Sequence, residues 1–393
     1  MKKNVISILL SLCIPLLATG CANEASVPTT NSTIPVTTGS LPTETTMQTE
    51  PVEIPDLPLL AFSAPVQTQN HYAEDGTLLF TYAYQDISLI LEDPQIADDI
   101  AIDLLNYVDY ENSSAKRILS DAQSAYDGQE DWISFAYSTF FSPARFDQGV
   151  LSLYGTHSTY SGSPRSVTTG TSISYDLLSG RQLSLTDILV KDYSADTLSQ
   201  LITNALTPLS EQGLLFSDYA YVVSELFTTN RPVDSWYFSE SSLCFYFAPY
   251  EIAPFSSGTI TAEIPYSALI GLLKEEYFPA EISEFSGSHY VLSFQDAKLE
   301  QFDQFAELVL EENGKQYLLY TDGCLQNLRI ELGSRLDDGS FHPEAAVFSA
   351  PTLCAGNGIV IHASEETIHS LQITYKDGNS TVTVDISSEV PNS

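Results

Sequence analysis

Apolar side chains recur every three or four residues in several parts of the chain, as they do on one face of a helix. The first run follows Pro94 and continues through Ile100 to Leu104. A second helical pattern surrounds Leu119, and a third run forms one apolar face from Leu198 to Leu206. A closing helix is expected at 266–273. The pattern thus predicts helices in the first three quarters of the chain.

Short runs rich in aromatic and β-branched residues predict strands between these helices, at 77–84, 133–141, 150–154, 172–175, 243–247 and 259–264. From about residue 286, short apolar runs alternate with turn dipeptides, namely Asn313-Gly314, Asp322-Gly323, Asp338-Gly339, Asn357-Gly358 and Asp377-Gly378. The predicted fold class is α+β: an antiparallel sheet with flanking helices, followed by a small, mostly β C-terminal domain that closes near residue 386.

The first 21 residues have the pattern of a bacterial lipoprotein signal. Lys2 and Lys3 precede a short apolar segment, and Leu17-Ala18-Thr19-Gly20-Cys21 closes it. We therefore expect a lipid on Cys21 and a position on the outer face of the bacterial cell membrane; a plain secretory signal is the alternative. Residues 22–57 are dominated by Thr, Ser, Pro and Glu, a composition typical of a disordered linker.

These features divide the chain into five expected parts. They are the signal peptide at 1–20, Cys21 with the linker at 21–57, an α+β domain at 58–150, a second domain at 151–284, and a β-rich domain at 285–393.

The chain is strongly acidic, with 51 Asp and Glu against 15 Lys and Arg and a formal net charge of -36. This charge repels phosphates, so we expect no nucleic acid partner, and contact with a membrane only through the lipid anchor. It favours a cationic protein partner. The alternative is that acidity only keeps an exported protein soluble.

Three cysteines lie beyond Cys21, namely Cys244, Cys324 and Cys354. Outside the cytoplasm, a disulfide between Cys324 and Cys354 is the favoured pairing, because both fall in the C-terminal region. The alternative is that all three are buried free thiols. No CxxC motif is present to suggest a zinc or thioredoxin-like site.

Catalytic and metal-binding patterns are weak. The six histidines show no HxH, HxxxH or HExxH spacing, and no GxSxG motif is present. Asp337-Asp338-Gly339 lacks the rest of a calcium loop and favours a turn. We therefore expect no enzyme activity, no cofactor and no metal site, although a Ser-His-Asp set built from distant positions stays open.

The run from Tyr250 to Gly258, YEIAPFSSG, precedes Ile264-Pro265-Tyr266 and follows the strand ending at Phe247. It resembles the signature of the RsiV-like extracytoplasmic domain family. The stretch from Tyr175 to Asp187 also resembles this family, and residues 66–141 resemble the domain that precedes it in RsiV-like proteins and in PdaC-type polysaccharide deacetylases. Where the family commonly has Tyr-x-Gly-Gly-Ala-His, this chain has YSGSPR from Tyr160 to Arg165, without the histidine.

The resemblance implies a binding module, with lysozyme as the known ligand of RsiV. The positions that match the motifs are the candidate ligand-binding residues, namely Tyr160, Gly162, Tyr250, Glu251 and Pro254. The alternative is structural: Glu251 then only caps a loop, and Tyr160 and Gly162 form a turn.

The expected function is therefore non-catalytic recognition of an extracellular ligand, either a lysozyme-like cationic protein or a cell-wall glycan such as peptidoglycan. The alternatives are an enzyme or accessory of cell-wall glycan modification, and a purely structural envelope protein.

Overall fold

The computed structural model of the chain describes residues 59–62, 67–85, 87–91, 93–129, 131–227, 233–279, 288–298, 300, 302, 304–311, 313–336, 340–377 and 380–386. Within these residues the fold is α+β, with a β-rich C-terminal region, as the sequence predicts. The expected signal peptide, Cys21, the linker and the Asp337–Gly339 turn lie outside the described residues. None of the helices in the described part is long and apolar enough to span a membrane.

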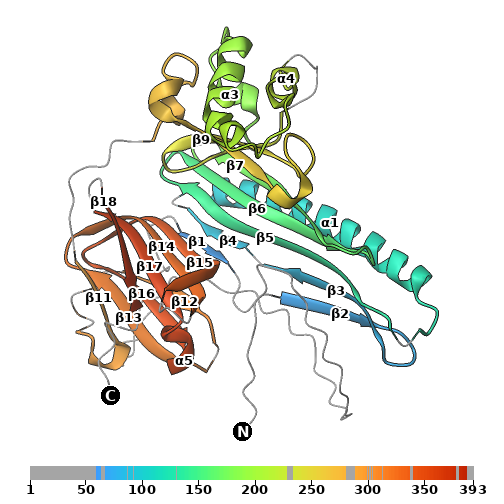
Figure 1. Cartoon of the computed structure of the whole chain (residues 1–393). Helices are drawn as coiled ribbons and strands as arrows, with labels where there is room; N and C mark the ends of the chain where they lie inside the picture. The colour runs from blue at the N-terminus through green and yellow to red at the C-terminus, as the bar shows by residue number, and fades with distance from the viewer. Residues whose placement is uncertain are drawn as a thin grey trace.

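The first large unit is a five-stranded sheet covered on one face by a long helix (Figure 1). Its strands, in spatial order, are β2 (Gln67–Tyr72), β3 (Leu78–Tyr84), β5 (Phe135–Phe146), β6 (Val150–Tyr160) and β7 (Val167–Asp176). β3 and β5 are parallel, and the other pairs are antiparallel. The boundary expected between residues 150 and 151 falls at the start of β6, so this one sheet includes parts of both expected domains.

The helix α1 (Pro94–Ala125) carries the chain from the β3 side of this sheet to β5. Asp93 caps its start, because the side chain accepts a hydrogen bond of 2.9 Å from the backbone N–H of Gln95. The two helical patterns of the sequence lie in this single helix, since no glycine or proline interrupts it after Pro94. Its buried stripe continues from Ile100 to Ala122.

A smaller unit lies against the end of this sheet (Figure 1). Its three antiparallel strands are β8 (Trp236–Phe238), β9 (Ser242–Phe247) and β10 (Ile260–Pro265), and its helices are α2 (Leu185–Ile188), α3 (Ala195–Glu211) and α4 (Tyr219–Glu225). The helix predicted at 198–206 is confirmed as part of α3, whose apolar face is fully buried at Leu198, Ile202 and Leu206. This face and the sheet share one core.

The helix expected at 266–273 is wrong. The segment forms one 3-10 turn, η2 (Tyr266–Leu269), and a second 3-10 turn, η3 (Glu275–Tyr277), follows. Ile270 has extended backbone angles and Gly271 has a φ of 82°, so the chain leaves the helical conformation there.

The smaller unit contacts the five-stranded sheet through β7 and β8. Gly170 on β7 allows this approach, because a Cβ atom there would lie 2.7 Å from the ring of Tyr246. The Ser172 hydroxyl donates to the backbone oxygen of Trp236 at 2.5 Å, and the backbone N–H of Phe238 donates to the Ser152 hydroxyl at 3.0 Å. The buried Ser152 and the half-buried Ser172 thus replace a regular strand ladder between the two sheets.

The C-terminal body is a sandwich of two sheets around a shared core (Figure 1). The four-stranded sheet contains β11 (His289–Ser293), β13 (Lys315–Thr321), β16 (Asn357–Ala363) and β12 (Gln304–Val309) in that order. The six-stranded sheet contains β18 (Ser380–Asp385), β17 (Leu371–Asp377), β14 (Cys324–Arg335), β15 (Phe341–Cys354), β1 (Leu59–Phe62) and β4 (Ile87–Ile90). The short helices η4 (Phe294–Asp296) and α5 (Glu365–Ile368) complete this body.

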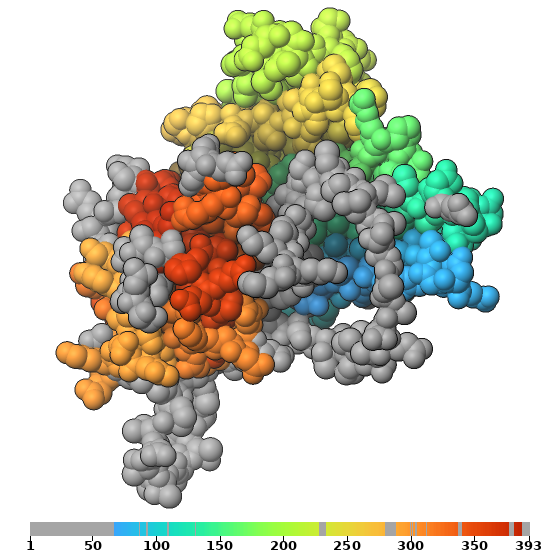
Figure 2. All heavy atoms as spheres, turned by 60° about the horizontal axis from the view of Figure 1, so that its bottom comes forward, coloured from blue at the N-terminus to red at the C-terminus, as the bar shows by residue number. Residues whose placement is uncertain are grey.

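Two strands of this body come from the other end of the chain. β1 lies between β15 and β4, and Leu60 faces Ser349 on one side and Leu89 on the other. The expected domain 285–393 therefore forms one sheet together with residues from the expected domain 58–150. Figure 2 shows the orange and red body beside the blue surface of the N-terminal strands.

The C-terminal turns and cysteines can be compared with expectation. The disulfide between Cys324 and Cys354 is confirmed, and the two residues face each other in the β14–β15 ladder. Cys244 is a buried free thiol, and burial raises its pKa to about 11, so it is unreactive at neutral pH. The turn expected at Asn357-Gly358 lies slightly earlier, because Gly356 has the positive φ and Asn357 already begins β16.

Removing this disulfide should destabilise the C-terminal body. It joins positions 30 residues apart, and the chain entropy released by opening a loop of that size corresponds to about 3.5 kcal/mol. We expect the variant Cys324→Ala/Cys354→Ala to lose about that much free energy of unfolding in urea titrations. Dithiothreitol should weaken the parent protein equally and leave the variant unchanged. A loss well below 1 kcal/mol in both experiments would contradict this assignment.

Candidate functional site

Three of the five candidate residues lie in one loop between β9 and β10. The backbone N–H of Tyr250 donates to the oxygen of Ala253 at 3.0 Å, and that of Glu251 donates to Ala248 at 3.0 Å. The carboxylate of Glu251 accepts a hydrogen bond of 2.8 Å from the Ala248 N–H, as the structural alternative expects. Pro254 is exposed and precedes the 3-10 turn η1 (Phe255–Ser257). These bonds hold the loop in one conformation.

Tyr250 itself points outward. Its φ is 71°, a left-handed conformation that costs a bulky residue free energy, and 68% of its surface is exposed. Its ring lies 5.5 Å from that of Phe255, centroid to centroid, and the guanidinium of Arg165 lies 6.0 Å from the Phe255 ring. We call Tyr250, Pro254, Phe255 and Arg165 the aromatic loop patch.

The other two candidates, Tyr160 and Gly162, lie at the turn between β6 and β7. Gly162 has a φ of 79°, and a Cβ atom there would lie 3.0 Å from the ring of Phe135. The ring of Tyr160 meets the same Phe135 edge to face at 6.4 Å. Tyr160 and Gly162 thus pack on Phe135, and it is Arg165, from the same turn, that reaches the Tyr250 loop.

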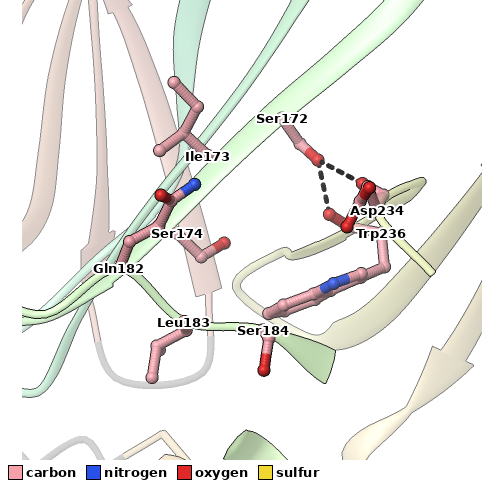
Figure 3. Close-up of a pocket in the computed structure, with 8 residues that line it drawn as sticks. All are labelled: Ser172, Ile173, Ser174, Gln182, Leu183, Ser184, Asp234 and Trp236. Carbon is pink, nitrogen blue, oxygen red and sulfur yellow. Dashed lines mark hydrogen bonds between the residues drawn. The ribbon is translucent and has the colours of Figure 1, made fainter. Parts of the chain in front are cut away.

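A polar pocket of about 270 Å³ lies where β7 meets the start of β8 (Figure 3). Its lining comes from β7, from the segment before α2 and from β8, namely Ser172, Ile173, Ser174, Gln182, Leu183, Ser184, Asp234 and Trp236. Figure 3 shows Gln182 and Trp236 on opposite sides, with Ser174 between them. Gln182 and Asp234 are exposed at the rim, whereas Trp236 is 4% exposed. None of these residues was a sequence candidate.

A third group of polar side chains is buried between α1 and the five-stranded sheet. Glu111 on α1 is 2% exposed, and one carboxylate oxygen accepts hydrogen bonds from the Tyr137 hydroxyl and, at 2.9 Å, from the Thr139 hydroxyl. The Nδ1 atom of His157 lies 3.3 Å from the same oxygen, and its Nε2 atom lies 3.1 Å from the Tyr107 hydroxyl. We call these five residues the polar layer.

The polar layer separates two apolar clusters under α1. Burial alone raises the pKa of Glu111, but hydrogen bonds from His157 and Tyr137 outweigh it, so the pKa lies below its usual value. Burial also raises the pKa values of Tyr107 and Tyr137, which stay neutral and able to donate. The second carboxylate oxygen of Glu111 is buried and has no hydrogen-bond partner among the described residues.

The described residues contain no group of three His, Cys, Asp or Glu side chains arranged to hold a metal ion. The expected lipid attachment at Cys21 lies outside the described residues. The arrangement therefore offers two surfaces open to a ligand, the aromatic loop patch and the pocket, and one buried polar layer.

Part of the chain is similar to known proteins. Similar solved structures include a member of the DUF3298 family from Bacteroides fragilis, with 17% identity, a TM-score of 0.42, and coverage of 55% of this chain and 94% of that one. A DUF3298 family protein from Pseudomonas aeruginosa gives 15% identity, a TM-score of 0.41, and coverage of 56% and 97%. No curated protein matches the chain. Residues 186–267, which run from α2 to η2 and include the Tyr250 loop and, of the pocket lining, Asp234 and Trp236, match the family described as "Protein of unknown function (DUF3298)".

Proposed function

We propose that the chain is a lipid-anchored protein of the bacterial cell surface that binds a cationic extracellular protein and performs no catalysis. The observation that carries this proposal is Tyr250, a large aromatic side chain held 68% exposed on a strained backbone. Strain of this kind costs about 1–3 kcal/mol and persists where the surrounding structure enforces it, often at sites of function. The hydrogen bonds of the loop hold Tyr250 in this strained conformation.

The composition of the aromatic loop patch supports a protein ligand. Tyrosine and arginine are the side chains that most often dominate the energy of protein interfaces, and both occur here as Tyr250 and Arg165. Phe216, which is 36% exposed, adds to the apolar surface nearby, because its backbone N–H donates to Ile252 in the same loop at 2.9 Å. A rigid aromatic anchor loses little conformational entropy on binding.

The charge of the chain supports a cationic partner. A net charge of -36 attracts basic proteins over long distances and raises their association rates. The resemblance of the Tyr250 loop to the RsiV-like signature points to a lysozyme-like partner. The pattern ending at Cys21, with Lys2 and Lys3 before it, supports the lipid anchor.

Binding of hen egg-white lysozyme to the purified full-length chain tests this proposal. We expect the Tyr250→Ala variant to bind at least about tenfold more weakly than the parent, because an interface hot spot contributes about 2 kcal/mol or more and tenfold corresponds to about 1.4 kcal/mol. A salt series separates specific contact from charge attraction, which is screened beyond about 8 Å at physiological ionic strength. The measurement is the dissociation constant by surface plasmon resonance from low to moderate salt.

Tyr221→Ala is the matched control, since Tyr221 is 65% exposed on α4 and lies outside the aromatic loop patch. It should bind lysozyme as the parent does. Binding that disappears at moderate salt, or that survives equally in Tyr250→Ala, would reduce the interaction to general acidity and overturn the proposal. Binding to purified peptidoglycan in place of lysozyme would favour the cell-wall alternative.

The enzyme alternative makes a different prediction. An enzyme or accessory of glycan modification would change peptidoglycan chemically, and that change would depend on an acid such as Glu251. The Glu251 carboxylate is already engaged with the Ala248 N–H in the loop. This engagement favours a structural role for Glu251 within a binding loop.

A further inference from the structure

The pocket between β7 and β8 is the second surface open to a ligand, and the proposed protein partner does not require it. It is built by three segments of the fold: Ser172 and Ser174 lie on β7, Gln182 precedes α2, and Asp234 and Trp236 lie at the start of β8 (Figure 3). Hydrogen bonds from the Ser172 hydroxyl to the backbone oxygens of Asp234 and Trp236, at 3.4 and 2.5 Å, fix the two walls relative to each other. The pocket is therefore preformed.

Polar groups that lack a partner within the protein surround this cavity. No described residue forms a side-chain hydrogen bond or ion pair with the Asp234 carboxylate or the Gln182 amide. The indole N–H of Trp236 likewise has no acceptor among the described residues. It is not one of the buried polar atoms that lack a partner, so it keeps contact with solvent and can donate to a ligand in the pocket.

The unpaired groups include both donors and acceptors. The indole N–H only donates, the Asp234 carboxylate only accepts, and the Gln182 amide does both. A guanidinium or ammonium group offers donors alone, and a phosphate or carboxylate offers mainly acceptors. Hydroxyl groups donate and accept, so a ligand with several hydroxyls on one small frame satisfies all three side chains.

The volume and charge of the pocket further limit the chemical class of its ligand. Pockets for drug-sized ligands usually exceed about 300 Å³, so a cavity of about 270 Å³ suits a single small ring. Leu183, Ile173 and Trp236 supply apolar surface for the C–H groups of such a ring. The net charge of -36 and the Asp234 carboxylate disfavour anionic ligands.

We propose that this pocket binds one pyranose sugar residue that carries no negative charge. The Asp234 carboxylate accepts from its hydroxyls, and the Gln182 amide both accepts from and donates to them. The indole N–H of Trp236 donates to a ring substituent, and an amino group on the sugar adds affinity through Asp234. This site goes beyond the protein-binding role proposed above and does not depend on it.

The two tryptophans of the chain allow a direct test by NMR of the full-length protein labelled with ¹⁵N. Trp236 lines the pocket, whereas the indole N–H of Trp132 donates to Leu78 at 3.1 Å in another part of the fold. Titration with glucose, glucosamine and glucuronate should move the indole signal of Trp236 saturably for the first two sugars. A single sugar corresponds to weak binding, with a dissociation constant of about 1 mM. The Trp132 signal, assigned with Trp132→Phe, should stay in place.

Variants at the rim separate this site from general weak binding. Asp234→Asn should weaken the binding of glucosamine at least fivefold and the binding of glucose by less. Gln182→Ala should weaken the binding of both sugars. Asp218→Asn, an exposed aspartate at the start of α4, is the matched control and should bind like the parent. The proposal is overturned if the Trp236 signal does not respond to any of the sugars, if Trp132 moves equally, or if the rim variants bind unchanged. If the Trp236 signal of Tyr250→Ala still responds to sugars, sugar binding in the pocket is independent of protein binding at the aromatic loop patch.

Discussion

Replacing Arg145 by methionine is expected to lower the free energy of unfolding by about 4 kcal/mol, because it removes a buried charged group together with all of the hydrogen bonds that it donates. Arg145 is 3% exposed and contacts Asp147 at 2.6 Å. It also donates to the Tyr266 hydroxyl at 3.1 Å and to the backbone oxygen of Tyr277 at 2.7 Å. Its guanidinium lies 5.2 Å from the ring centroid of Phe238.

These contacts give Arg145 a role that its position in the sequence does not suggest. The residue lies in β5 of the five-stranded sheet, while Phe238, Tyr266 and Tyr277 belong to the smaller unit that contains the Tyr250 loop. We therefore expect Arg145→Met to loosen the contact between these two units as well as to lower the midpoint of urea unfolding. Hydrogen exchange at Tyr277 and Phe238 would report that loosening.

Arg181→Met is the matched control for this prediction. Arg181 forms an ion pair with Asp187 at the same distance of 2.6 Å, but its side chain is 55% exposed. Exposed pairs contribute about 0–1 kcal/mol, so this variant should unfold almost as the parent does. Equal effects of the two substitutions would show that burial of Arg145 is not what makes its ion pair stabilising.

Glu111→Ala is expected to have a comparable effect, a loss of about 4 kcal/mol, through the polar layer. The substitution would leave the buried hydroxyls of Tyr137 and Thr139 without their acceptor, and His157 without its carboxylate. Glu111→Gln should cost less, because its amide oxygen still accepts. Urea unfolding at neutral pH measures both, and Glu74→Ala, at an exposed position, should change little.

The pH dependence of the free energy of unfolding shows whether the charge of Glu111, and not only its size and shape, stabilises the fold. Its pKa is lower in the folded protein than in the unfolded chain, so its charge stabilises the fold fully above the unfolded value of about 4.3. That stabilisation is lost as the pH falls through the lower folded value. The stability difference between the parent and Glu111→Gln should therefore shrink in acid, and a difference that stays constant would contradict the assignment.

Elements with a regular apolar period were predictable. The stripe from Leu198 to Leu206 predicted α3, since each buried turn of that helix repeats the same spacing. The same reasoning failed at 266–273, although Tyr266, Leu269 and Leu273 are all buried as a helix would require. Two short turns around Gly271 bury the same residues, so apolar spacing alone did not distinguish the two conformations.

The candidate site was predictable only where its residues are close in sequence. Tyr250, Glu251 and Pro254 stand in one motif and lie in one loop. The pocket instead combines β7 with the residues before β8, and no local pattern joins Gln182 to Asp234. The polar layer required the strand register, because His157 faces Thr139 directly in the β5–β6 ladder while Glu111 comes from a separate helix.

The position of β1 has a consequence for the order in which the protein assembles. β1 is among the first segments of the fold to be synthesised, yet it sits between β4 and β15, and β15 comes from the far end of the chain. Closing such a long loop delays pairing, and an unpaired strand edge can join a strand of another molecule in the meantime. The six-stranded sheet is therefore completed late, after nearly the whole chain has been made, and a truncated chain that stops before Phe341 leaves the β1–β4 pair without β15, the neighbour of β1.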